Sequence, residues 1–180
     1  MKKYAAIGIA GYVLSASTWV FMLIKHFHPA ICTYILSYLL RSITWIILGK
    51  KHKILLFTLT GATIMILGSG MLLSLFHGQL MIALISWMLY SMTEVASYQY
   101  AQRKFEVESF KYALISAIGL MLLFTYFFTD SVLPYEASII FQAASAIFIA
   151  SSIAAAFSFH HLERQSNNIH RISSKIIFKH

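Results

Sequence analysis

The chain has 180 residues, of which 59% are hydrophobic and only 11% are charged, and its mean hydropathy is +0.73. No water-soluble domain of this length could carry so apolar a composition on its surface, which excludes the soluble classes, and the single cysteine, Cys32, excludes an internal disulfide and any site built from several thiolates. The formal net charge of +8 would suit an anionic partner, either nucleic acid or lipid.

The first apolar segment follows the basic start Met1-Lys2-Lys3 and resembles a signal peptide as far as Ser15-Ala16-Ser17. The apolar run continues to Ile24, which makes it about 21 residues long, enough to cross the hydrocarbon core of a bilayer. We therefore expect an uncleaved signal anchor that forms the first transmembrane helix.

Five further apolar segments follow, separated by short polar loops. Pro29 suits the start of the second segment, and Gly49 its end, before a dense basic loop. We predict an all-α polytopic membrane protein with six transmembrane helices, at about 4–24, 29–48, 54–76, 80–101, 111–129 and 137–159. Residues 1–161 would form this six-helix domain and residues 162–180 a basic cytoplasmic tail. The tail could lie on the inner leaflet, or it could be disordered.

Lysine and arginine are distributed unevenly among the predicted loops. With the N-terminus inside, twelve of the 14 lie in inner segments, Lys25 alone lies outside, and Arg41 lies within the bilayer. Because cytoplasmic loops collect basic residues, both termini are predicted to be cytoplasmic. The net charge then reflects a basic rim facing anionic lipid, so we expect no nucleic-acid partner.

Small residues mark possible helix-packing faces. On the sixth predicted span they recur at four-residue spacing, and glycines play the same part on the first and third spans. On the sixth span they are Ala146, Ala150, Ala154 and Ser158, flanked by Ser151 and Ala155. On the third span they are Gly61, Gly68, Gly70 and Ser74, and on the first span Gly8, Gly11 and Ser15. These faces favour ordinary packing, with a dimer contact or a sliding surface as the alternative.

The second and fourth spans each have one polar, aromatic face at helical spacing. These faces carry Tyr34, Tyr38, Arg41 and Trp45 on the second span and Trp87, Tyr90, Ser91, Glu94, Ser97 and Tyr98 on the fourth. Arg41 and Glu94 each lie nine residues before the first basic residue of the following inner loop, which places both about 13 Å above that loop. Equal depth on parallel helices predicts that the two side chains meet or share a cavity.

Three interpretations of these residues remain open. They could form a buried ion pair that sets the helix register, or Glu94 could bind a cationic or protonatable substrate and exchange a proton with it. Alternatively, Arg41 could reach a cavity or the lipid headgroups alone. The candidate substrate-binding residues are Glu94, Arg41, Trp87, Tyr90, Tyr98, Tyr38 and Trp45.

Catalytic and metal-binding patterns are missing from the sequence. The histidines form no HExxH motif and none lies deep inside a span, so we predict neither a metal site nor haem or another cofactor. G-x-S-x-G, P-loop and dinucleotide motifs are also missing, so we predict that the chain is not an enzyme.

The predicted function is a small transporter-like protein that binds or moves a small molecule, for which a cation is one candidate, through a polar, aromatic-lined cavity between the second and fourth helices. The alternative is a non-transporting sensor or accessory subunit in which Arg41 and Glu94 only fix packing. We expect the chain in the cell membrane, or the inner membrane of a Gram-negative source, in contact with lipid and working as a homo-oligomer or with a partner membrane subunit.

Overall fold

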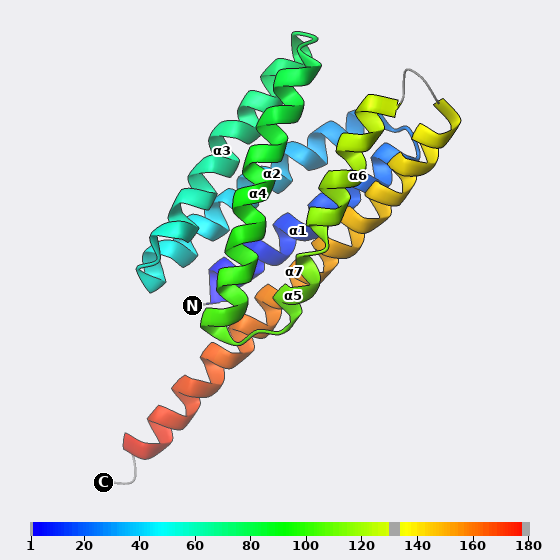
Figure 1. The fold of residues 1–180 in the computed structure, drawn as a ribbon. Helices are drawn as coiled ribbons and strands as arrows, with labels where there is room; N and C mark the ends of the chain where they lie inside the picture. Colours follow the sequence, from blue (N-terminus) through cyan, green and yellow to red (C-terminus); the bar gives the residue numbers. More distant parts are fainter. Residues whose placement is uncertain (1, 130–133, 178–180) are drawn as a thin grey trace.

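The computed structural model is all-helical over the residues that it describes, which are 2–129 and 134–177 for the backbone and 4–79, 81–126 and 138–162 for the side chains (Figure 1). Its helices are α1 (Lys2–Leu23), α2 (Phe27–His52), α3 (Leu55–Phe76), α4 (Leu80–Phe105), α5 (Ser109–Ala113), α6 (Ser116–Thr129) and α7 (Pro134–Ile177). The predicted all-α class is confirmed for this part of the chain.

Among the residues whose side chains the structure describes, five segments are long and apolar enough to cross a membrane: Tyr4–Leu23, Phe27–His52, Leu55–Phe76, Ser109–Tyr126 and Ser138–Leu162. Helix α4 is as long as α2 and carries Glu94 and several polar residues, and its described part is not among the five. The segments support a membrane-embedded helical protein. The count of six spans and the cytoplasmic side of the termini stay predictions.

The helices form a ring around a central space. Helix α1 packs against α2 and α7, α2 packs against α3, α3 packs against α4, and α6 packs against α7. The ring is closed through α5 and through a short contact between α4 and α6. Helices α2 and α4 are not among the closely packed pairs, so only side chains that reach into the centre can join them.

The loops that carry most of the basic residues lie together with the start of α1, at what we call the basic end of the bundle. Lys51 Nζ lies 4.6 Å from the centre of the Tyr4 ring, and the ring of His52 contacts the ring of Phe105. The α1–α2 and α3–α4 turns lie at the opposite end (Figure 1). The structure thus gathers these basic loops at one end, as the predicted topology requires.

Glycines allow close helix contacts at several of the positions that the sequence predicted. A Cβ atom added at Gly61 of α3 would lie 2.6 Å from the carbonyl oxygen of Ser42 on α2, and one at Gly8 would lie 2.9 Å from Thr44 Cγ2. The predicted stripe on α7 is divided, because Ala146 and Ala150 are exposed whereas Ser158 and the flanking Ser151 and Ala155 are buried. The face of α7 that packs inside the bundle also carries Ala144, Ser145, Phe148, Ser152 and Phe159.

The fifth predicted span is interrupted. Helix α5 ends at Ala113, and α6 begins at Ser116 after a turn in which the Ala117 N–H donates to the Leu114 carbonyl at 3.0 Å. The Ala113 carbonyl accepts hydrogen bonds from Ser116 Oγ at 2.9 Å and Ser151 Oγ at 2.7 Å. The break is therefore stabilised by two serine hydroxyls.

Helix α7 does not end near residue 159, as predicted for the sixth span, but continues without interruption to Ile177. Its last part projects beyond the other helices (Figure 1). This continuous helix does not fit the disordered alternative for the tail, and the contact of the tail with the inner leaflet stays a prediction.

Candidate functional site

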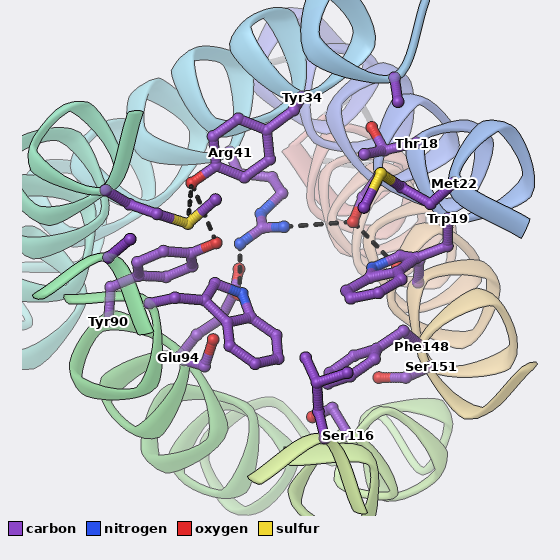
Figure 2. Close-up of a pocket in the computed structure, with 18 of the residues that line it drawn as sticks. Thr18, Trp19, Met22, Tyr34, Arg41, Tyr90, Glu94, Ser116, Phe148 and Ser151 are labelled. Carbon is purple, nitrogen blue, oxygen red and sulfur yellow. Dashed lines mark hydrogen bonds and ion pairs between the residues drawn. The ribbon is translucent and has the colours of Figure 1, made fainter. Parts of the chain in front are cut away.

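The central feature of the bundle is a buried ion pair. Arg41 Nη2 on α2 lies 2.7 Å from Glu94 Oε2 on α4, and both side chains are less than 10% exposed. The two residues meet at the same level of the bundle, as their equal depth predicted. Because α2 and α4 both pack against α3 but not closely against each other, this pair joins them through the interior of the ring (Figure 2).

The other oxygen of Glu94 is held by aromatic side chains. The Tyr12 hydroxyl on α1 donates a hydrogen bond to Glu94 Oε1 at 2.7 Å. Trp45 Nε1 donates to the Tyr12 oxygen at 3.0 Å and lies 3.3 Å from Oε1. Both carboxylate oxygens therefore accept hydrogen bonds, which offsets much of the cost of burying the charge.

Arg41 has fewer partners than its donor groups allow. Nη1 donates to Ser15 Oγ at 3.2 Å, and Ser15 in turn accepts from Ser152 Oγ on α7 at 3.1 Å. The guanidinium carbon lies 5.4 Å from the centre of the Tyr12 ring and 5.8 Å from that of Tyr90. Nε has no partner, and it is the only buried side-chain nitrogen or oxygen in this state among the side chains that the structure describes.

Aromatic rings fill the bundle between the ion pair and the basic end. We call this group, contributed by α1, α2, α3, α4, α5 and α7, the inner aromatic cluster. Its members are Tyr12, Trp45, Phe57, Tyr98, Phe110 and Phe159, all buried. The ring of Phe159 contacts those of Tyr12, Trp45 and Phe110, each with 5.5 Å between ring centres. This packing closes the interior on that side.

A cavity of about 350 Å³ lies on the other side of the ion pair (Figure 2). It extends to the opposite end of the bundle, where Phe27, Ile31 and Leu75 are part of its wall and are also exposed. Its wall is mainly apolar and aromatic, and among the described residues that line it two are charged, Arg41 and Glu94. A cavity of this size and character is typical of a site for a small, mostly apolar molecule.

Five of the predicted site residues line this cavity, namely Arg41, Trp87, Tyr90, Glu94 and Tyr98. The other two, Tyr38 and Trp45, do not. The Tyr38 hydroxyl is hydrogen-bonded to Ser69 Oγ on α3 at 3.2 Å, because this side of α2 faces its packing neighbour. Trp45 lies in the inner aromatic cluster and contacts Glu94 from the side of the ion pair that faces away from the cavity.

The sequence predicted a cavity between α2 and α4. The cavity extends beyond that space, because the whole ring of helices encloses it. Helices α1 and α7 supply wall residues that sequence reasoning missed, among them Trp19 and Phe148, whose rings stack with 4.6 Å between centres. The sequence did indicate a similar face on α1, because Tyr12, Ser15 and Trp19 recur at steps of three and four residues, as the polar and aromatic residues of α2 do. The glycines beside them favoured a purely packing role.

The chain has no match among known family models, curated proteins or solved structures. Function must therefore be argued from the site alone. Among the described side chains, no three His, Cys, Asp or Glu residues lie close enough to hold a metal ion.

Proposed function

We propose that this protein binds a small molecule in the central cavity and moves it across the membrane. The observation that carries the proposal is the cavity of about 350 Å³, which reaches the opposite end of the bundle and has a buried ion pair in its wall. A bundle packed only for stability would fill such a space with side chains, because protein interiors are close-packed.

The closed basic end also supports the proposal. A carrier exposes its site to one side at a time, and one barrier stays shut while the other is open. Here the inner aromatic cluster is the shut barrier, and the ion pair lies where it meets the cavity. Movement of a ligand to the basic end requires the rings of Tyr98, Phe110 and Phe159 to separate, so the cluster would act as the inner gate.

One observation favours a second candidate, a non-transporting sensor or accessory subunit. Both oxygens of Glu94 already accept hydrogen bonds from Arg41, Tyr12 and Trp45, so the pair needs no ligand to be stable. In that case the cavity would bind a ligand or a lipid chain, and the basic end would never open.

Accessibility of a cysteine in the cavity distinguishes these candidates without knowledge of the ligand. Ser91 lies in the cavity wall and is buried, and cysteine is close to serine in size. The full chain would carry Cys32→Ser and Ser91→Cys and be reconstituted in sealed vesicles with one orientation. A membrane-impermeant methanethiosulfonate is then applied from either side. His77→Cys and Glu108→Cys, both at exposed turn positions, are the matched controls for each side.

A transporter predicts that the cysteine at position 91 reacts from both sides, faster from the side of His77, while each control reacts from one side only. Reaction at position 91 from a single side would refute transport and support the sensor or accessory role. Reaction from neither side would show that water does not reach the cavity, which also contradicts transport.

A further inference from the structure

The hydrogen-bonding capacity of the cavity wall is unbalanced toward donors. A guanidinium has five N–H groups, and the structure gives partners to two of them, one on Ser15 and one on Glu94. One further N–H group is left on each of Nη1 and Nη2, whereas Nε, which also has no partner, is covered by protein and does not face the cavity. A buried donor without an acceptor is costly, so this part of the wall favours a ligand that supplies an acceptor.

Both carboxylate oxygens in the same wall already accept hydrogen bonds. Glu94 Oε2 is bound by Arg41, and Oε1 is bound by Tyr12 with Trp45 close by. The hydroxyls of Tyr34 and Tyr90 are paired with each other at 3.3 Å. A cation in this cavity would find aromatic faces but no free carboxylate oxygen.

Net charge limits the ligand further. Arg41 and Glu94 neutralise each other, so an added anion or cation would leave one uncompensated charge in a largely apolar cavity. A neutral molecule avoids that cost. The aromatic wall around Trp19, Trp87 and Phe148 suits a ring or a short apolar body.

We propose that the ligand of this cavity is a neutral, mostly apolar molecule with a carbonyl-type oxygen, which accepts a hydrogen bond from the N–H groups of Arg41 that Ser15 and Glu94 leave free. This inference rests on the proposed function only in taking the cavity as the binding site. It proposes an uncharged acceptor in place of the cation that was one candidate from the sequence.

Four probes of similar size test the assignment: acetophenone, which has the carbonyl; ethylbenzene, which lacks it; benzoate, an anion; and phenyltrimethylammonium, a cation. Binding of each to the full chain in lipid nanodiscs is measured by equilibrium dialysis and expressed against the free probe concentration. Specific binding is the part lost in Ser91→Phe, which fills the cavity, and kept in Ile66→Phe, which adds a ring at an exposed position of α3.

We expect acetophenone to bind about tenfold more tightly than ethylbenzene, the scale of one hydrogen bond to a charged donor, and more tightly than either ion. In the charge-neutral double variant Arg41→Met/Glu94→Gln this preference should disappear. In Tyr112→Phe, which removes a hydroxyl at an exposed position of α5, it should be unchanged.

If the double variant does not fold, Ser15→Ala provides the second test. It leaves the ion pair in place and frees one more N–H of Arg41, so the preference for acetophenone should be kept or increased. A loss of that preference in Ser15→Ala would overturn the role of Arg41.

Two results would overturn the ligand class while leaving the cavity as a binding site. One is specific binding of all probes with no advantage for the carbonyl, and the other is tightest binding of benzoate or phenyltrimethylammonium. No specific binding of any probe would overturn the ligand class and would also count against the proposed function. Access of a cysteine at position 91 from both sides would then show whether transport survives independently.

Discussion

Arg41 and Glu94 illustrate how two costly residues can become a stable centre. Burial of two charges is expensive, and their attraction compensates only when the remaining donors and acceptors also find partners. Tyr12 and Trp45 supply those partners for the carboxylate, and Ser15 supplies one for the guanidinium. Loss of either charge alone would leave the other buried without its counter-ion.

This dependence predicts strong coupling between the two positions. Arg41→Met and Glu94→Gln should each lower the free energy of unfolding by about 3–5 kcal/mol, because each leaves the charge of the other residue buried without its counter-ion. The double variant should cost clearly less than the sum of the two. The measurement is a double-mutant cycle on reversible unfolding in mixed detergent micelles, and additive effects would mean that the pair does not contribute to stability.

Sequence reasoning located the ion pair because depth and helical face follow directly from residue counting. It could not identify Tyr12 as the donor to Glu94, because nothing in a single helix says which distant helix will face it. The positions of Tyr38 and Trp45 outside the cavity wall could not be foreseen for the same reason. One helix face as wide as that of α2 contacts both a neighbouring helix and the interior.

At the scale of the element, close helix contacts depend on glycine. Gly61 allows α3 to approach α2 so closely that Ser42 Oγ donates a hydrogen bond to the Gly61 carbonyl at 2.7 Å. The other glycines of α3 differ in their surroundings. A Cβ atom at Gly70 would have only Ser86 Oγ nearby, at 4.0 Å.

These surroundings predict opposite effects for one substitution at two positions of the same helix. Gly61→Ala should destabilise the protein by about 1–3 kcal/mol, because its methyl group would overlap the Ser42 carbonyl. Gly70→Ala should be neutral or stabilising by up to about 1 kcal/mol, since alanine favours the helix more than glycine does. Thermal unfolding of both variants beside the unsubstituted chain checks this, and a larger loss at position 70 than at position 61 would contradict the packing.

The break between α5 and α6 could not be read from the sequence. The segment is continuously apolar there, and Ala113, Leu114 and Ile115 are compatible with an ordinary helix. What stabilises the interruption is Ser151, which comes from α7 and donates to the Ala113 carbonyl. A hydroxyl 38 residues away satisfies the carbonyl that the break leaves without its helical partner.

At the scale of the whole molecule, the ring of helices explains why the cavity is central and has one closed end. Its closure depends on α4, which carries Glu94 and several polar residues and joins α6 only through a short contact. A polar helix can cross a membrane when its polar face is turned toward the bundle interior. Glu94, Ser97 and Tyr98 of α4 are buried in this way.

The six-span topology therefore predicts that α4 crosses the bilayer and separates its two ends. With Cys32→Ser as background, His77→Cys should react with an impermeant maleimide in intact cells, and Glu108→Cys should react only after permeabilisation. This follows from the positive-inside distribution of Lys and Arg. If α4 did not span the membrane, both cysteines would react from the same side, and the count of six would be wrong.

The sequence by itself determined the class of the protein and the level of its charged centre. Composition requires a bilayer, the loops carry the basic residues, and equal residue counts place Arg41 and Glu94 at one depth, because all of these depend only on local hydropathy and helical rise. Only the tertiary structure decided that Tyr12 and Ser15 complete the pair, that aromatic rings close one end, and that a cavity remains at the other. Those features depend on which helix faces meet, and that is set by side-chain packing between segments far apart in the chain.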